Sequence, residues 1–289
     1  MNKTAKVIVT MLLIILFSVL SELFLRDTFG SLYVFVIAPL FWLVLAIFSK
    51  FFIFDNGRHI FEYKRFLIVL LITAGLFYVV VYFGLGVILS GFARSTYDTT
   101  LEGILYNMWV LGLAIVTMEM VRSSLVNANT TFSERSMRVI VTILFTFISF
   151  NYISMSKEFS DIYGIVKFLG LTFMPTIILN ALLTSMVKKA GPLPGIIYQM
   201  ILGLSLWLAP ILPAHKWVVV ALMSSLMPFF IFLIMDNRVK MKENKISKTV
   251  LQKADPKKWI IRFVVIGALM LFLLGLFLVS STSYQGSCS

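Results

Sequence analysis

The residues best suited to chemistry in this sequence are few, and the clearest charged pair is Glu119 with Arg122. They stand three positions apart in an apolar stretch, which puts both side chains on one helical face, where they can form an ion pair. An intramembrane pair could hold a substrate or pass a proton, since charged groups are costly in lipid and commonly mark functional sites. Its position near the end of the stretch favours a simpler interpretation, an ion pair that helps to fix the helix end.

Other polar residues give weaker signals. Asn107, Asn180 and Gln199 also lie in apolar stretches, and we interpret them as hydrogen-bonding groups between helices. The histidines, His59 and His215, fall in different loops, and the chain has one cysteine. No disulfide within the chain and no multi-cysteine metal site can be built from these residues, so we expect no metal and no cofactor. The sequence also contains no Walker A, GxGxxG or HExxH motif.

The stretches that carry these residues are predicted to be membrane-spanning helices. Hydrophobic residues make up 60% of the 289-residue chain, charged residues only 13%, and the mean hydropathy is +0.97. A soluble domain has roughly 25% charged residues. Uniformly apolar runs of about 20 residues match helices that cross the ~30 Å hydrocarbon layer, whereas barrel strands would alternate. The sequence therefore predicts an all-α, polytopic transmembrane helix bundle.

About nine spans are expected, and the basic residues orient them. The spans lie at roughly 7–25, 32–52, 66–90, 101–121, 137–155, 165–187, 195–212, 217–235 and 259–280. With the N-terminus inside and the C-terminus outside, 20 of the 25 Lys and Arg residues fall in cytoplasmic segments. The net charge of +12 is thus interpreted as a membrane-orienting signal, and no nucleic-acid partner is expected. We expect a multi-pass protein of a bacterial plasma membrane, with the lipid bilayer as its partner.

The hydrophilic stretch before the last span divides the chain. Residues 1–235 form an eight-helix transmembrane domain, 236–258 a basic cytoplasmic linker, 259–280 the ninth transmembrane helix and 281–289 a short outer tail. The linker could attract anionic lipid, at about 1 kcal/mol per basic residue near the surface. A solvated linker that anchors two helices is the favoured interpretation.

Several short segments, in order along most of the chain, carry a family resemblance. They precede a lysine-rich loop and a final span, and they are Ala93–Tyr97 with Gly103–Asn107, Glu119–Arg122, Gly191–Tyr198 and Ala209–Pro213. Their order resembles the long hydrophobic N-terminal region of clostridial-type signal peptidases I, in which a serine peptidase domain follows many helices. None of these segments is itself a catalytic motif.

The resemblance implies a position for the catalytic serine, just beyond the last helix on the outer membrane surface. Ser289 stands at that place in this sequence. The family's downstream substrate-binding strands and general base do not fall within the 289 residues, so we expect this chain alone to be inactive as a protease. His215 and Lys216 are expected on the same side of the membrane as Ser289. The alternative is that Ser289 belongs to an ordinary polar tail.

Three functions remain open from the sequence. The first is the membrane domain of a signal-peptidase-I-like protein, with signal peptides of exported proteins as partners. The second is a small-molecule or lipid transporter, and the third is a non-catalytic membrane scaffold. A transporter requires a substrate-sized polar cavity at mid-membrane depth, whereas a solid bundle argues against transport. The oligomeric state does not follow from the sequence.

Overall fold

The computed structural model describes residues 2–53, 63–152, 155, 158, 159 and 161–246, and these residues are mostly helical. The elements, with π-helical turns marked η, are α1 Lys3–Leu20, η1 Ser21–Leu25, α2 Arg26–Leu32, η2 Tyr33–Ile37, α3 Ala38–Phe52, α4 Lys64–Leu85, η3 Gly86–Ser90, β1 Phe92–Arg94, α5 Leu101–Asn107, η4 Met108–Gly112, α6 Leu113–Val126, α7 Glu134–Ile148, α9 Ile162–Phe168, η5 Leu169–Phe173, α10 Met174–Ala190, α11 Leu193–Trp207, β2 Ile211–Pro213 and α12 Trp217–Ile246.

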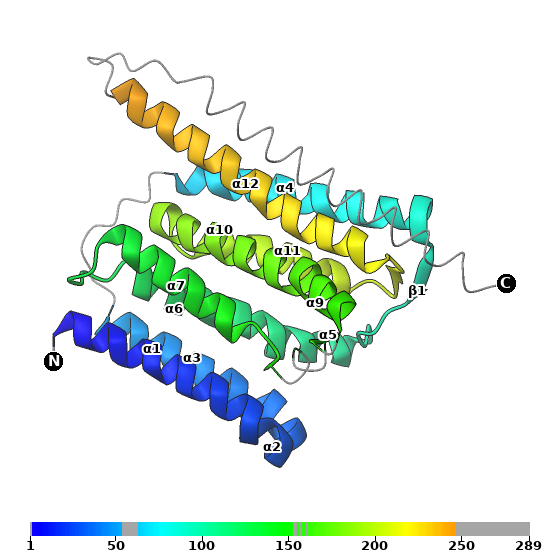
Figure 1. Cartoon of the computed structure of the whole chain (residues 1–289), viewed down its shortest axis with the longest axis horizontal. Helices are drawn as coiled ribbons and strands as arrows, with labels where there is room; N and C mark the ends of the chain where they lie inside the picture. Colours follow the sequence, from blue (N-terminus) through cyan, green and yellow to red (C-terminus); the bar gives the residue numbers. More distant parts are fainter. Residues whose placement is uncertain (1, 54–62, 153–154, 156–157, 160, 247–289) are drawn as a thin grey trace.

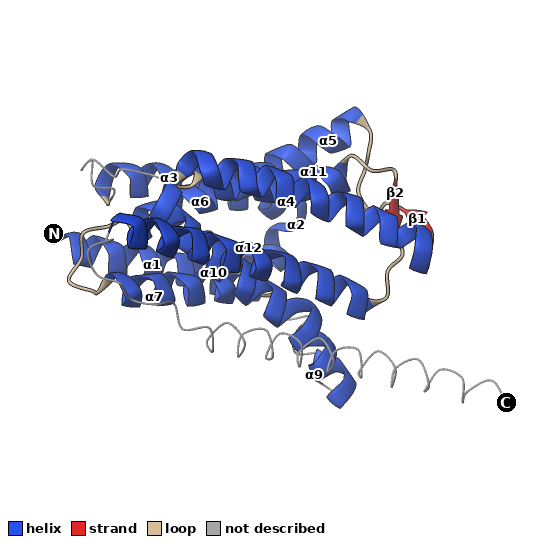
Figure 2. Cartoon of the chain, turned by 90° about the horizontal axis from the view of Figure 1, so that it is seen from above, coloured by secondary structure: helices blue, strands red, loops and turns tan. Residues whose placement is uncertain are grey.

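The long helices lie side by side in a bundle, as Figures 1 and 2 show from two directions. Five helical segments are long and apolar enough to cross a membrane. They are 3–52, 64–90, 101–126, 162–190 and 217–237. The prediction of an α-helical membrane protein is therefore confirmed in this coarse form.

The first of these segments, residues 3–52, is a hairpin of two helices and not one straight rod. Gly30 has φ 48° and ψ −118°, a conformation that glycine adopts far more readily than other residues, and the chain reverses there. The two arms meet through stacked rings of Phe17 and Phe41, 3.6 Å between centroids. The Tyr33 hydroxyl donates a hydrogen bond to Ser21 Oγ at 2.9 Å. The reversal agrees with two predicted spans on either side of residues 26–31.

Two hydrophobic clusters hold the bundle together. One joins α1 and α3 to α6 and α7, with Leu45, Leu125 and Phe145 among its buried members. The other joins α4 to α10, α11 and α12, with Leu71, Leu183 and Tyr198. Helices α6 and α10 pack against each other between these clusters. Polar side chains of these two helices consequently meet in the interior of the bundle.

One end of the bundle is rich in basic residues, and we call it the basic end. It gathers the start of α1, α4 and α7 and the end of α3 and α10, with Lys3, Lys6, Lys50, Lys64, Arg65, Arg135, Arg138, Lys188 and Lys189. Contacts across this end include a Lys188–Glu134 ion pair at 3.1 Å and a hydrogen bond from the Thr131 N–H to Thr4 Oγ1 at 3.2 Å.

The opposite end is joined by a two-stranded antiparallel sheet, which the sequence did not predict. Strand β1 follows α4 and strand β2 follows α11, with Ala93 opposite Leu212. The ladder is extended by hydrogen bonds from the Ser95 N–H to the Pro210 carbonyl and from the Ala214 N–H to the Gly91 carbonyl, both at 3.0 Å. The sheet satisfies backbone groups where two helices have ended. We call this the sheet end.

Three helix ends differ from the expected spans. Helix α7 ends at Ile148, earlier than the expected end near 155. Directly after Ile148, Ser149 Oγ donates a hydrogen bond to the Phe145 carbonyl at 2.7 Å. Helix α11 stops at Trp207 and not near 212, because Pro210 has no N–H to continue a helical ladder. Helix α12 continues to Ile246, so the first part of the expected linker is helical. The remaining linker, the ninth span at 259–280 and the tail at 281–289 lie outside the described residues.

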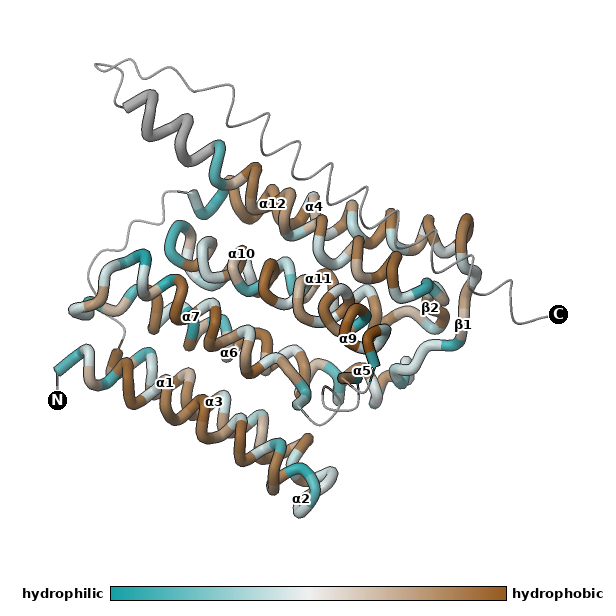
Figure 3. The backbone as a smooth tube through the Cα atoms, in the orientation of Figure 1, coloured by the Kyte–Doolittle hydropathy of each residue, from teal (hydrophilic) through white to brown (hydrophobic). Residues whose placement is uncertain are grey.

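The surface of the bundle is strongly apolar. In the most apolar 18-residue stretch of each long segment, only 11% to 28% of the residues are buried, so most of these side chains point outward. Phe51 and Ile88 are each 77% exposed and Val80 is 70% exposed. Figure 3 shows hydrophobic residues along the helices and hydrophilic residues mainly near their ends. Such large apolar faces suit contact with lipid and not with water.

All five π-helical turns lie in the same half of the bundle. Turns η1 and η2 flank the hairpin reversal, η3 ends the helix before β1, and η4 and η5 lie shortly after the starts of the helices that begin at the sheet end. Each therefore lies in the half of the bundle nearer the sheet end. A π-turn accommodates one extra residue in a helix, and such turns are often found near functional sites.

Candidate functional site

Glu119 and Arg122 form a buried ion pair in the interior of the bundle. Arg122 Nε lies 3.0 Å from Glu119 Oε1, and the side chains of Arg122 and Glu119 are 3% and 1% exposed respectively. The spacing of three residues on α6 places both on the face that meets α10 and α11. The pair is thus surrounded by other helices and does not lie at the bundle surface, which weighs against the simple role of fixing a helix end.

Helix α10 supplies neutral partners for the Arg122 guanidinium. Nη2 donates to Asn180 Oδ1 at 2.8 Å, and Nη1 donates to Thr184 Oγ1 at 3.0 Å and to the Asn180 carbonyl at 3.4 Å. Asn180 and Thr184 are four residues apart, so they lie on the same face of α10. The guanidinium also lies over the Phe145 ring of α7, with Cζ 4.0 Å from the ring centroid. These contacts offset part of the cost of burying the cation.

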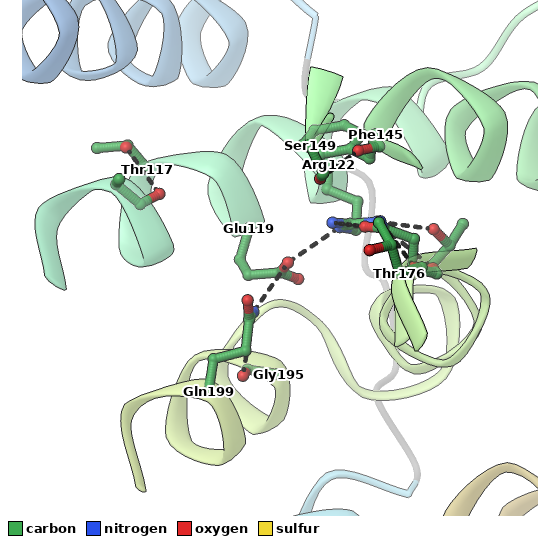
Figure 4. A network of polar contacts seen from close by, with 11 residues as sticks. Thr117, Glu119, Arg122, Phe145, Ser149, Thr176, Gly195 and Gln199 are labelled. Carbon is green, nitrogen blue, oxygen red and sulfur yellow. Dashed lines mark hydrogen bonds and ion pairs between the residues drawn. The ribbon is translucent and has the colours of Figure 1, made fainter. Parts of the chain in front are cut away.

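Helix α11 supplies the partner of Glu119. Gln199 Nε2 donates to Glu119 Oε1 at 3.2 Å and to the Gly195 carbonyl at 3.4 Å. Figure 4 shows the carboxylate between Gln199 on one side and Arg122 on the other. The polar network therefore joins α6 to the consecutive helices α10 and α11, although Asn180 and Gln199 lie 58 and 80 residues from their partners on α6.

A cavity of about 280 Å³ adjoins this network. Six helices line it, through Tyr78 of α4, Met118, Glu119 and Arg122 of α6, Phe145 of α7, Pro175, Thr176, Leu179, Asn180 and Leu183 of α10, Tyr198, Gln199 and Leu202 of α11, and Ser224 and Pro228 of α12; Ser149 also lines it. Hydroxyls, amides and one ion pair thus share the walls with apolar and aromatic side chains. This mixture is typical of small-molecule sites.

The cavity lies near the middle of the bundle. Glu119 is seven residues from the end of α6, about 10 Å along the helix axis from the basic end. Ser224 is seven residues into α12, about 10 Å from the sheet end. The lining residues therefore extend through the central part of the bundle, away from both of its ends.

Two prolines lie within the helices that line the cavity. Pro228 lies inside α12, and without its N–H the Ser224 carbonyl lacks its usual helical donor. Pro175 follows η5 and lies in the first turn of α10, and α9, η5 and α10 together form one continuous helical segment, 162–190. Ser224 and both prolines line the cavity. Each proline lacks an N–H, so one carbonyl of the preceding turn has no helical donor, although both segments continue as helices.

Glu119 retains one unsatisfied oxygen. Oε2 is fully buried and has no hydrogen-bond partner among the described residues. A Cβ atom placed on Gly195 would lie 3.1 Å from Oε2 and 3.1 Å from Leu183 Cδ2. The absence of a side chain at Gly195 therefore permits the carboxylate to lie against the start of α11.

The other residues marked by the sequence do not join this site. Ser289 lies outside the described residues. Asn107 is away from the cavity, and its buried Nδ2 has no hydrogen-bond partner in the described part of the chain. His215, at the sheet end, lies 2.7 Å through Nδ1 from Ser90 Oγ and 2.9 Å through Nε2 from the Tyr82 carbonyl. It therefore joins the end of α4 to the loop before α12.

Several cavity residues were not predicted from the sequence. The sequence predicts that Asn180 and Gln199 form hydrogen bonds between helices, which they do, but it does not predict that they meet the Glu119–Arg122 pair. Pro175 and Pro228 were a usable signal, because proline inside a membrane span needs compensating structure. Thr184 was another signal, since it lies one helical turn from Asn180 in an apolar stretch.

No group of three or more His, Cys, Asp or Glu side chains that could hold a metal ion occurs within the described ranges. Comparison of the chain with known protein families, characterised proteins and solved structures finds no significant match. Function must consequently be inferred from the membrane-like surface, the buried ion pair and the cavity.

Proposed function

We propose that this chain is a multi-pass membrane transporter that binds a small polar solute in the six-helix cavity. The observation that carries the proposal is the buried Glu119–Arg122 pair on the wall of a cavity in the middle of an apolar bundle. A purely structural core would be at least as stable with well-packed apolar residues, because burying two charges costs several kcal/mol per ion. The retained pair suits a site that must recognise a polar group.

We also propose the membrane topology. The chain would cross a bacterial plasma membrane about nine times, with the basic end in the cytoplasm and the sheet end outside. The distribution of lysine and arginine supports this orientation, because the sheet end holds only a few basic residues in the described ranges: Arg26, Arg94, Lys167 and Lys216. The N-terminus would then be inside and the C-terminus outside. A reporter fused after Ser289 tests it, and activity in the cytoplasm would contradict the scheme.

The test of transport is to fill the cavity without disturbing the ion pair. The full chain would be reconstituted into liposomes and supplied with labelled amino acids, monocarboxylates, sugars and amines. Thr176→Phe places a ring in the cavity, whereas Val80→Phe places the same ring on the 70%-exposed face of α4. We expect Thr176→Phe alone to abolish uptake of the transported solute. Uptake of no member of the panel, or unchanged uptake by a folded Thr176→Phe variant, would contradict the proposal.

A second candidate is the membrane domain of a signal-peptidase-I-like protein. One observation favours it: the segments that carry the resemblance contact each other in pairs. Ala93 and Arg94 pair with Leu212 and Ile211 in the β1–β2 sheet. Glu119–Arg122 meets Gly191–Tyr198 where the carboxylate lies against Gly195. The resembling residues thus build two contacts of the fold, as expected if the fold is common to that family.

The two candidates predict different gene sequence downstream of the Ser289 codon. An open reading frame that continues with methionine and then a β-rich segment containing lysine would support the peptidase domain. The extended product should then remove signal peptides, and Ser289→Ala should abolish that cleavage. Unrelated sequence after the Ser289 codon would exclude Ser289 as the nucleophile of such an enzyme.

A further inference from the structure

The contact between Glu119 and Arg122 uses only part of each charged group. A guanidinium has five N–H donors, and Arg122 makes one bond to Glu119, two through Nη1 and one through Nη2. One N–H of Nη2 therefore has no partner among the described residues. On the other side, Glu119 Oε2 has none either.

A carboxylate that matched the guanidinium fully would bind through both oxygens. Such bidentate pairs are stronger and more specific than contacts through a single oxygen. Glu119 contacts Arg122 through Oε1 alone and shares that oxygen with Gln199. A small free carboxylate in the adjoining cavity could make the bidentate contact that Glu119 does not make.

We propose that the transported solute is a small monocarboxylate, which replaces Glu119 on Arg122 while Glu119 accepts one proton. This inference rests on the transport function proposed above and specifies its solute and its coupling. Before binding, the site holds one carboxylate anion and one guanidinium. Afterwards it holds the solute anion, the same guanidinium and a neutral Glu119 carboxylic acid. One anion and one proton enter together, so the net charge of the site stays at zero.

The neutrality of the site is the reason for the proton. Besides the pair itself, the titratable side chains that line the cavity are Tyr78 of α4 and Tyr198 of α11. The lining residues of α7, α10 and α12 contribute none, only neutral groups such as Asn180 and Ser224. A second carboxylate without a proton would leave an uncompensated anion buried among helices, at a cost of several kcal/mol. Protonation of Glu119 removes that cost.

The cavity restricts the solute to a small molecule. Its volume of about 280 Å³ lies just below the usual range for ligand sites, roughly 300–1,000 Å³. Apolar walls such as Leu179 and Leu202 suit the carbon chain of a short acid. The Thr176 hydroxyl can donate to a keto oxygen, and the Ser224 hydroxyl, which donates to the Val220 carbonyl, can accept from a hydroxy group. Pyruvate and L-lactate are therefore the chosen probes.

The experiment measures uptake of labelled pyruvate and L-lactate into liposomes that contain the full chain and a trapped pH indicator. We expect uptake to acidify the interior, to fall by up to about tenfold for each unit of rising external pH below saturation, and not to respond to an imposed membrane potential. Empty liposomes measure direct diffusion of the undissociated acid. Uptake that responds to potential, or that moves no proton, would refute the coupling.

Variants separate the two charged residues. Glu119→Gln is neutral at every pH and keeps the shape of the side chain, so its uptake should lose the pH dependence. Arg122→Gln should lose uptake altogether, and Arg122→Lys should lose most of it because lysine cannot make the bidentate contact. Glu134→Gln, at a 75%-exposed side chain of the basic end, should behave as the natural chain. Unchanged pH dependence in folded Glu119→Gln would refute the role of Glu119.

The solute panel distinguishes failure of the carboxylate inference from failure of the transport function. If amines or sugars enter and are blocked by Thr176→Phe while carboxylates do not enter, the carboxylate inference fails and the transport function stands. If nothing in the panel enters, the transport function fails and the inference fails with it.

Discussion

Removing one member of the buried ion pair should destabilise the protein more than removing both. In Arg122→Met, four hydrogen bonds disappear and the Glu119 carboxylate stays in a site where it is 1% exposed. A buried charge left without its partner costs about 3–5 kcal/mol. Glu119→Met should cost less than Arg122→Met, because Arg122 retains its bonds to Asn180 and Thr184 and its contact with Phe145.

The double variant Glu119→Met/Arg122→Met leaves no buried charge. Its main losses are the hydrogen bonds that Asn180, Thr184 and Gln199 make to the two charged groups, and hydrogen bonds between helices average roughly 0.6 kcal/mol each in membrane proteins. We therefore expect the double variant to be more stable than Arg122→Met, with a coupling of about 2–3 kcal/mol between the two sites. The measurement is reversible unfolding of the purified chain in mixed micelles with increasing denaturing detergent.

A matched control lies at the basic end. Lys188 and Glu134 form an ion pair of nearly the same length, 3.1 Å, but their side chains are 27% and 75% exposed. Glu134→Gln should cost less than about 1 kcal/mol, because exposed pairs contribute little. The reasoning is refuted if Glu134→Gln and Arg122→Met cost the same, or if the two methionine substitutions are additive.

Three further predictions concern the sheet end. Gly86→Ala should lower the free energy of unfolding by about 1–3 kcal/mol in the same assay, because a Cβ there would lie 2.8 Å from the proline of β2. Gly84→Ala is the control: a Cβ there would have no atom within 4 Å, so this variant should be neutral or stabilising. Cysteines at the paired positions Ala93 and Leu212, in a background without other cysteine, should form a disulfide with a membrane-impermeant oxidant; no cross-link would contradict the pairing or its outward location. His215→Phe should lose both ring hydrogen bonds, so its free energy of unfolding should fall by about 1–3 kcal/mol. A variant as stable as the natural chain would contradict these contacts.

Much of the fold follows from the order of apolar and basic segments. Apolar runs predict membrane helices because lipid contact leaves few alternatives, and the five long segments lie where the sequence placed them. Local spacing was equally informative, since positions 119 and 122 lie on one helical face and do pair. These features depend only on neighbours in the chain.

The rest depended on contacts between distant segments. Nothing local indicates that Thr184 approaches Arg122, 62 residues away, or that 92–94 pairs with 211–213. Helix α11 also ended before the apolar stretch did, because hydropathy does not register that a proline ends the backbone ladder. The cavity belongs to the same class, since it exists only where six helices meet.

The π-turns have a consequence for how this fold can vary. Each carries one residue more than an α-helical turn of the same height, so deleting one residue from it restores an α-helix and leaves both flanking faces in register. Deletion of Val110 within η4, for example, should be accepted, while deletion of a residue from α6 would rotate its remaining residues by about 100° relative to their neighbours. When related sequences are aligned, single-residue insertions and deletions should therefore occur mainly near the sheet end. The number of residues in each helix should be constant in the half of the bundle near the basic end.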